Sequence, residues 1–320
     1  MKIKAGLLPL YIKLYDEVVP EIRERLESFY DTIARQIANN GIEVIKNPFC
    51  RIKPEFEEAV ESFEMNNADV IITIHMAYSP SLESIDALCK TDLPIVVLDT
   101  TQTLEFGAGQ DSGEIMYNHG IHGVMDLCSM LTRRKKPYAI AAGHYSASNA
   151  IERVCGFVRA AACAKALKNA HVGLIGGAFD GMGDFRVSYE ELLNKFGIKI
   201  EQMNAAKCRE IYESLTESEI KAEIEKNAVE FDFDENVKAD EYELSVKSCL
   251  ALRKYVEMEG LSAYSVNFTQ IGLDTCGLTD ALYRVLQSDG KRNRLCRRGR
   301  CPDRRLYRSF SCRVSGFLLC

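Results

Sequence analysis

Residues 69–75 read DVIITIH, and residues 94–99 read PIVVLD. Both runs are apolar at consecutive positions and do not alternate, which is typical of parallel strands that helices cover on both faces. A stretch of helical length and amphipathic pattern follows each run, so strand-like and helix-like segments take turns along the chain. This order predicts a doubly wound α/β domain.

The same alternation extends in both directions from these two runs. Residues 1–170 contain the predicted strands Ile3–Leu8, Ile42–Ile45, Asp69–His75, Pro94–Asp99 and Tyr138–Ala142, with predicted helices over Val18–Asn40, Pro54–Asn66, Pro80–Cys89, Ile115–Lys135 and Ser146–Lys168. The pattern restarts at His171, with predicted strands Val172–Ile175, Ile198–Gln202 and Ala263–Phe268 and predicted helices within Ser188–Phe196, Ala205–Asn227, Glu241–Met258 and Thr279–Gln287. We therefore expect two doubly wound, Rossmann-like α/β domains over residues 1–170 and 171–290, followed by a tail over residues 291–320.

Composition is that of a soluble globular protein, with 47% hydrophobic and 27% charged residues. No run of about 18 apolar residues occurs, so we expect no membrane span. The first ten residues have neither the long apolar stretch nor the small-residue cleavage site of a signal peptide, and we expect a cytoplasmic protein. Eight cysteines are scattered singly before residue 290, which favours reduced, buried thiols.

Polar residues follow several predicted strands, where the working groups of an open α/β sheet gather. His75, Asp99 and His144 stand at three such strand ends. Each could instead be a capping or turn residue, but their equivalent positions favour a shared cleft. His119 and His122 are three residues apart and could share one helix face, either binding a metal together or donating to a polyol. The alternative is that one caps the helix while the other is solvated.

Residues 172–185 read VGLIGGAFDGMGDF, a glycine-rich turn after a predicted strand. The G-x-G-x-x-G spacing of dinucleotide-binding loops is absent, as is a Gly-Lys-Ser/Thr phosphate loop. This segment, NHGIHGVMDL at residues 118–127 and AGHY at residues 142–145 together resemble the L-arabinose isomerase/L-fucose isomerase family in order and spacing. The resemblance extends from about Lys4 to Gly290.

The resemblance implies an oligomeric enzyme that interconverts an aldose and a ketose with a divalent metal, usually manganese (Mn2+). It also implies a C-terminal β-rich domain after the two α/β domains. His119 departs from the glutamine of typical arabinose isomerases, and Leu8 and Pro9 replace a polar pair, so a related pentose or deoxyhexose fits as well as L-arabinose. The residues expected to contact the sugar are His75, Tyr78, His119, His122, Phe179 and Met182.

The tail differs from the rest of the chain. Residues 291–320 carry a net charge of +9, whereas residues 1–290 carry −15. The family continues here with a Gly-Glu-Gly-Asp turn whose glutamate binds the metal, and this motif is absent. Codons for residues 292 onward can be chosen so that a shifted frame reads Gly-Ile-Gly-Tyr-Ala-Gly-Glu-Gly-Asp, which indicates a frameshifted tail. The alternatives are a basic arm for nucleic acid, or a zinc site from the tail's four cysteines, whose spacings match no usual pattern.

From these observations we expect a chain related to sugar isomerases, without the family's β-rich domain, its catalytic residues or its metal ligands, and therefore inactive. Its expected partners are a small sugar and further copies of itself, and neither nucleic acid nor a membrane. A non-catalytic sugar-binding or regulatory module is the alternative, and a nucleotide-dependent oxidoreductase is a weaker one.

The frameshift can be tested on the gene. We expect the coding DNA across codons 292–300 to contain, in another frame, an uninterrupted stretch that encodes Gly-Glu-Gly-Asp. Sequencing the gene checks this, and a gene with no such frame removes the hypothesis.

Overall fold

The structure is a computed structural model of the chain, and it describes residues 2–176, 181, 187–230 and 238–267. It divides into two compact units, Met1–Lys165 and Ala166–Cys320. The division falls inside a helix, five residues before the boundary predicted from the sequence. The predicted tail, 291–320, and the predicted helix Thr279–Gln287 lie outside the described residues.

The first unit contains one parallel sheet of five strands, which confirms the predicted α/β class. The strand order is β2-β1-β3-β4-β5, and every neighbouring pair is parallel. The strands are β1 (Ile3–Leu10), β2 (Ile42–Lys46), β3 (Val70–His75), β4 (Ile95–Asp99) and β5 (Tyr138–Ala142). The helices are α1 (Lys13–Val18), α2 (Ile22–Asn39), α3 (Lys53–Met65), α4 (Ser81–Lys90), the 3-10 helix η1 (Ser112–Tyr117), α5 (Gly120–Arg133) and α6 (Ala150–Lys168).

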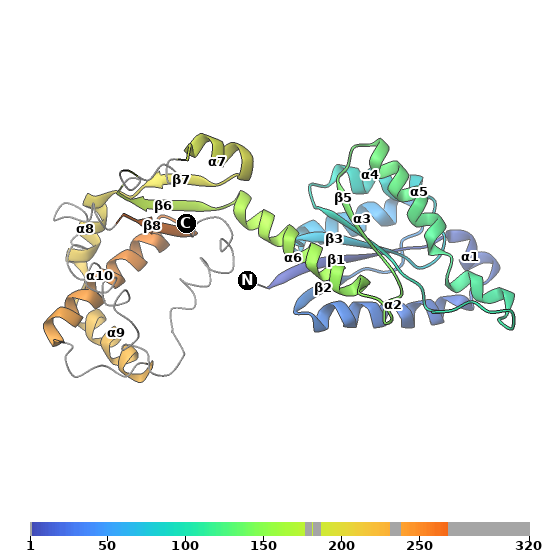
Figure 1. Cartoon of the computed structure of the whole chain (residues 1–320), viewed down its shortest axis with the longest axis horizontal. Coiled ribbons are helices and arrows are strands. Elements are labelled where there is room, and N and C mark those ends of the chain that lie inside the picture. The colour runs from blue at the N-terminus through green and yellow to red at the C-terminus, as the bar shows by residue number, and fades with distance from the viewer. Residues whose placement is uncertain (1, 177–180, 182–186, 231–237, 268–320) are drawn as a thin grey trace. The chain divides into compact units, whose positions relative to one another are not determined.

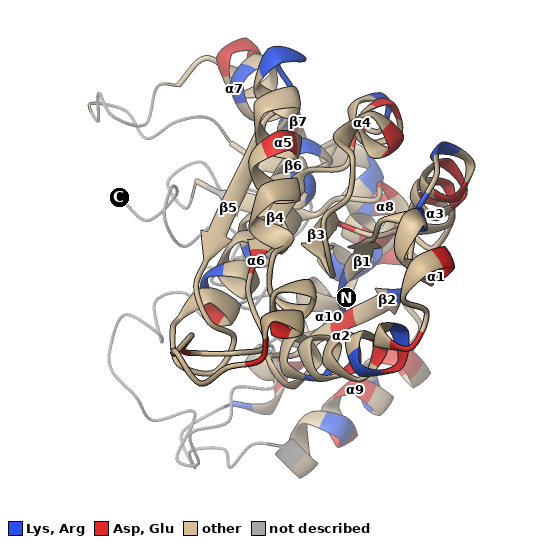
Figure 2. Cartoon of the chain, turned by 90° about the vertical axis from the view of Figure 1, so that its right-hand side faces the viewer, with Lys and Arg blue, Asp and Glu red and all other residues tan. Residues whose placement is uncertain are grey.

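Helices cover both faces of this sheet (Figure 1). Successive side chains of β3 enter different cores: Ile71 packs with α3, α4 and α5, whereas Ile72 packs with α2 and α6. Since a strand sends alternate side chains to opposite faces, a strand with two covered faces must be apolar throughout. This explains the unbroken apolar run, and β3 is buried along its whole length. Lys, Arg, Asp and Glu lie largely on the surrounding helices, and β3 carries none (Figure 2).

Two predicted helices are in fact interrupted, and each interruption has a local cause. The predicted helix Val18–Asn40 is split because Val19 precedes Pro20 and adopts φ −142° and ψ 57°, outside the helical region. The predicted helix Ile115–Lys135 is split at Asn118. The Asn118 amide binds the backbone oxygen of Glu114 and the hydroxyl of Thr103, and this side-chain bonding competes with helix continuation.

The second unit contains a three-stranded parallel sheet in the order β7-β6-β8. Its described elements are β6 (His171–Ile175), α7 (Tyr189–Phe196), β7 (Lys199–Gln202), α8 (Ala205–Ser214), α9 (Glu217–Glu230), α10 (Ala239–Met258) and β8 (Ala263–Val266). Thr216 separates α8 from α9. Its hydroxyl accepts from the Glu219 backbone N–H while the Glu219 carboxylate accepts from the Thr216 N–H, a capping box that starts a new helix. Across the described residues of both units, no helix is long and apolar enough to cross a membrane.

Substitution by alanine is expected to have opposite effects on stability at two glycines of the first unit. A Cβ on Gly6 would lie 2.5 Å from the buried Phe63 ring, so Gly6→Ala should lower the free energy of unfolding by about 1–3 kcal/mol through overpacking. Gly156 lies exposed inside α6 with no atom near its Cβ position, so Gly156→Ala should raise that free energy by about 0.5–1 kcal/mol. Urea unfolding followed by circular dichroism measures both, and equal effects of the two substitutions would contradict the packing described here.

Candidate functional site

The carboxyl edge of the five-stranded sheet is the place where its strands can present side chains to a ligand. In the order β2-β1-β3-β4-β5 the chain reverses its direction of winding between β1 and β3, and ligands of open α/β sheets bind at such a switch point. Tyr11 follows β1, and residues 76–80 follow β3. Gln102 lies beyond β4, and His144 beyond β5.

His75 ends β3 and is covered by the first turn of α5. A Cβ on Gly123 would lie 2.4 Å from His75 Cδ2, and a Cβ on Gly120 would lie 2.7 Å from the His75 backbone oxygen. The two glycines therefore allow the helix backbone to rest directly on the imidazole. His75 is 4% exposed, and burial lowers its pKa to about 3 although the carboxylate of Asp126 opposes this shift. Among the described residues neither of its ring nitrogens has a hydrogen-bond partner.

Asp126 also links α5 to the neighbouring helix α4. Its carboxylate accepts a hydrogen bond from the backbone N–H of Ser81, the first residue of α4, at 3.0 Å. Helix α4 starts after Pro80, which has no side chain able to accept from the helix N-terminus, so the acceptor comes from another helix. A carboxylate at this end of a helix is also favoured by the helix dipole. The β3–α4 connection, which includes Tyr78, is held in this way.

His119 is fixed by two hydrogen bonds that define its tautomer. Its Nδ1 lies 2.9 Å from the backbone oxygen of Ile115, which can only accept, so Nδ1 carries the proton. Its Nε2 lies 2.9 Å from the Tyr15 hydroxyl and therefore accepts from it. Burial lowers the pKa of His119. His122 lies exposed on the first turn of α5, with its ring centroid 6.3 Å from that of His119.

This geometry bears on both interpretations of the histidine pair. His119 precedes the first helical residue, but its side chain makes no cap hydrogen bond. Both of its ring nitrogens are already engaged, so it offers no free lone pair to a metal ion. Nor do the described residues contain a group of three or more His, Cys, Asp or Glu side chains that could hold a metal. The described part of the chain therefore does not fit the manganese ion that the family resemblance implies.

His144 has a structural role. Its Nδ1 accepts from the backbone N–H groups of Ser146 and Ala147 at 3.3 and 3.2 Å, so its Nε2 carries the proton and donates to the Gln102 backbone oxygen at 3.2 Å. The imidazole thereby joins the loop after β5 to the loop after β4. The sequence left open whether His144 faces a cleft or stabilises a turn, and these bonds favour the turn.

Unpaired polar atoms gather at the carboxyl edge. In the described structure, Thr73 Oγ1 inside β3 and Gln110 Oε1 are buried without a hydrogen-bond partner, and six further such atoms lie at or after the ends of three neighbouring strands. They are Tyr11 Oη after β1, His75 Nδ1 and Nε2 and Ser79 Oγ at β3, and Thr100 Oγ1 and Gln102 Nε2 after β4. A buried polar atom left unpaired costs about 1–3 kcal/mol, so such a cluster calls for an explanation.

The arginines beside this edge are paired with acidic side chains. Arg23 pairs with Asp16 at 2.8 Å and lies over the Tyr11 ring, 5.1 Å from its centroid. Arg25 forms a two-pronged pair with Glu114 at 2.6 and 2.8 Å. These arginines already have anionic partners, and the unpaired atoms themselves belong to side chains without charge. The edge therefore offers hydrogen bonds to a ligand with little net charge.

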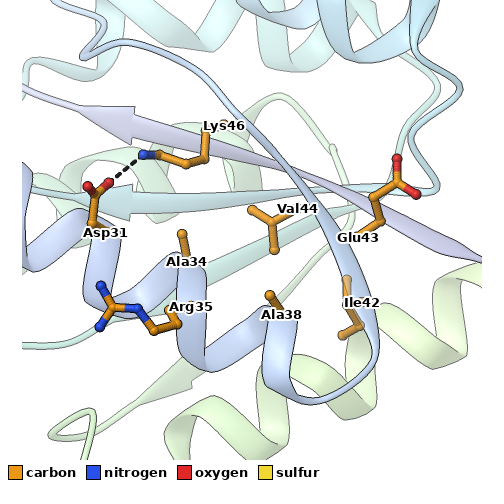
Figure 3. Close-up of a pocket in the computed structure, with 8 residues that line it drawn as sticks. All are labelled: Asp31, Ala34, Arg35, Ala38, Ile42, Glu43, Val44 and Lys46. Atoms are coloured by element: carbon orange, nitrogen blue, oxygen red, sulfur yellow. Dashed lines mark hydrogen bonds and ion pairs between the residues drawn. The ribbon is translucent and has the colours of Figure 1, made fainter.

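A surface hollow of about 380 Å³ lies elsewhere, between α2 and the edge strand β2 (Figure 3). Asp31 and Lys46 form an ion pair across it, and Ala34, Ala38 and Val44 form its floor. β2 pairs with residues 3–7 of β1, so the hollow lies beside the amino-terminal part of that strand. None of its lining side chains is among the buried groups without a hydrogen-bond partner, and the chemistry of the unpaired cluster makes the carboxyl edge the better candidate site.

The structure tests the predicted sugar contacts only by where it places them. It brings His75, His119 and His122 together around the first turn of α5, with His75 buried and His122 exposed. Tyr78 is half-buried in the β3–α4 connection. Phe179 and Met182 lie outside the described residues, so all six contacts remain predictions. Sequence reasoning missed Tyr11 and the glycine pair of α5, although the spacing of Gly120 and Gly123 was a usable signal of close helix packing.

No protein-family model matches the chain. Curated L-arabinose isomerases from Shewanella sp. strains MR-4 and MR-7 are each 23% identical to it over 243 residues, which is 72% of this chain and 48% of theirs. This chain is similar to L-arabinose isomerases. It spans about half the length of these relatives, and the predicted resemblance is confirmed at this coarse level.

Solved structures show a weaker likeness. A solute-binding protein of an ABC transporter from Agrobacterium vitis, bound with alpha-D-tagatopyranose, is 14% identical with a TM-score of 0.23, over 83% of this chain and 76% of that one. A periplasmic solute-binding protein from Actinobacillus succinogenes with bound D-allose has the same identity and TM-score, over 92% and 93%. A TM-score of this size supports no inference about fold or ligand.

Burial of His75 predicts loss of stability in acid. The unfolded chain binds a proton at this residue below its ordinary pKa of 6.5, whereas the folded chain keeps it neutral down to about pH 3. Stability is therefore complete above pH 6.5 and falls as the pH drops, by about 2 kcal/mol between pH 7 and pH 5. Urea unfolding at several pH values should show a flatter profile for His75→Leu than for the wild-type chain. The exposed His122 provides the control, because His122→Gln should retain the wild-type slope. Parallel profiles for His75→Leu and the wild type would contradict this assignment.

Proposed function

We propose that this chain binds a small, uncharged sugar at the carboxyl edge of the five-stranded sheet. The observation that carries the proposal is the cluster of unpaired, uncharged polar atoms at the ends of β1, β3 and β4. Sugar hydroxyls are both donors and acceptors, so a polyol can satisfy hydroxyl, amide and imidazole groups together. A phosphorylated sugar would need a free cation, and the arginines of this edge are already paired.

Similarity to L-arabinose isomerases supports a sugar as the ligand, because it extends over 72% of the chain. On this basis we propose descent from an aldose–ketose isomerase. The side chains proposed to contact the sugar are those predicted from the sequence: His75, Tyr78, His119, His122, Phe179 and Met182.

We propose that the chain binds without isomerising. Moving a proton between C1 and C2 of a sugar requires a general base and a group that polarises the carbonyl oxygen. In the described residues His75 is neutral with a pKa of about 3, His119 uses both nitrogens within the protein, and no metal-binding group of side chains occurs. The family's manganese ion remains an expectation for full-length relatives, and the out-of-frame tail over residues 291–320 is part of the same proposal.

The second candidate is a sugar-binding or regulatory module that does not descend from an active enzyme. It predicts the same binding site and the same affinity, and the coding DNA beyond codon 290 separates the two histories. Assembly with further copies in the cytoplasm is also proposed. Exposed apolar side chains surround the carboxyl edge, which fits a surface that an assembly covers; they include Leu104, Phe106, Ile115 and Met125.

Calorimetry beside an isomerase assay tests the function directly. Titration of the full chain with L-arabinose, related pentoses and deoxyhexoses should give saturable binding of at least one of them. The aldose-to-ketose assay with added manganese should show no turnover above background. Turnover would contradict the proposed loss of activity, and heat with NAD but with none of the sugars would favour a nucleotide-dependent enzyme.

A further inference from the structure

Asp99 and His75 are the last residues of the neighbouring strands β4 and β3. The register of β3 and β4 runs from Ile71 opposite Ile95 to Ile74 opposite Leu98, so the next pair along the two strands is His75 and Asp99. Alternation also places both side chains on one face. Val97 lies two positions before Asp99, and Ile71 lies four positions before His75. Both belong to the core beneath α3, α4 and α5, and side chains an even number of positions apart on a strand share a face.

A carboxyl group in this position is unusual because no described side chain pairs with it. Asp99 is half-buried, and within the described structure its carboxylate has neither a hydrogen bond nor an ion pair with another side chain. Its backbone does have a partner, since its carbonyl oxygen accepts from Gly143 N–H at 3.0 Å. Burial raises the pKa of Asp99. Burial also raises the pKa of Cys128 on α5, and the charge of Asp99 adds to this shift.

His75 is the complementary half of the pair. It is 4% exposed, with Nδ1 and Nε2 both lacking a partner among the described residues, and it is neutral. A neutral imidazole has one N–H donor and one acceptor nitrogen, whereas a carboxylate only accepts. The two neighbours together present the acceptors and the donor that adjacent hydroxyl groups of a polyol need.

We propose that Asp99 and His75 form one recognition unit for two adjacent hydroxyls of the bound sugar, with the Asp99 carboxylate accepting a hydrogen bond from one of them. This inference rests on the proposed function and adds Asp99 to the site. A metal ion is a poorer occupant, since the described residues offer no third ligand beside the pair. An anion is poorer still, because an unpaired carboxylate repels it.

Access to the pair passes through the first turn of α5. Gly120 and Gly123 have no side chains of their own, so the helix backbone lies directly against His75. Binding therefore requires this turn to move away from the end of β3. The same turn carries the exposed His122, which such a movement would leave beside the ligand.

A thermodynamic cycle between protein and ligand tests the unit. The full chain and its Asp99→Asn variant are titrated by calorimetry with the best-binding sugar and with its single-deoxy analogues. A hydrogen bond to a charged group predicts that Asp99→Asn weakens binding about 10- to 100-fold. One deoxy analogue should lose the same factor on the wild-type chain and nothing further on the variant.

Asp69→Asn is the matched control. Asp69 is a largely buried carboxylate at the opposite end of β3, where it accepts from the Lys4 backbone N–H and pairs with Lys165. Its loss should lower stability and leave sugar affinity within about twofold of the wild type. Unchanged affinity in Asp99→Asn, while the wild type binds sugar, would overturn the recognition unit and leave the proposed function standing. Absence of sugar binding by the wild-type chain would overturn both.

A second measurement does not depend on the variant folding. In the wild-type chain with 13C-labelled aspartate, the carboxyl resonance of Asp99 should shift on addition of the sugar, whereas that of Asp69 should stay in place. A saturable sugar titration in which the Asp99 resonance does not move would also overturn the recognition unit.

Discussion

Strand β3 is buried along its entire length between β1 and β4, with helices on both faces. This burial leaves no position on the strand where a polar side chain could reach solvent. Apart from the buried Thr73, the polar groups of β3 and its neighbours therefore lie where the strands end, and in a parallel sheet those ends form one edge. The placement of His75, Asp99 and Tyr11 follows from this constraint. So does the need for a helix with a glycine face to close the edge.

Helix α5 connects the core to the candidate site. Its inner face begins with two glycines that rest on His75 and continues with Val124, Leu127 and Leu131, which fill the core beneath α4 and β4. Asp126 on the same helix caps α4. One helix thus anchors the fold through its later turns while its first turn covers the unpaired imidazole. Stability and access to ligand are consequently linked, because a movement that uncovers His75 must leave the later turns packed.

Much of the fold could be predicted from the sequence, because burial on two faces leaves a pattern that does not depend on distant residues. The run DVIITIH gives β3 to within one residue, and β5 was predicted with the bounds that the structure shows. The interruptions at Val19 and Asn118 were missed for different reasons. The first interruption follows from Pro20 and could have been predicted from the sequence. The second depends on Thr103, which lies fifteen residues away from Asn118. The site was predictable only in part: the strand ends were visible, but the tautomer of His119 depends on Tyr15, which sequence spacing does not place beside it.

The central claim is that a sugar binds at the carboxyl edge of the sheet and not in the hollow beside β2. A nuclear magnetic resonance titration of the labelled full chain with the sugar that calorimetry selects tests it most directly. Amide shifts are expected around residues 75–79, 99–102 and 119–123, with residues 42–46 unchanged. Amide shifts confined to residues 31–46, with none at the carboxyl edge, would contradict the claim.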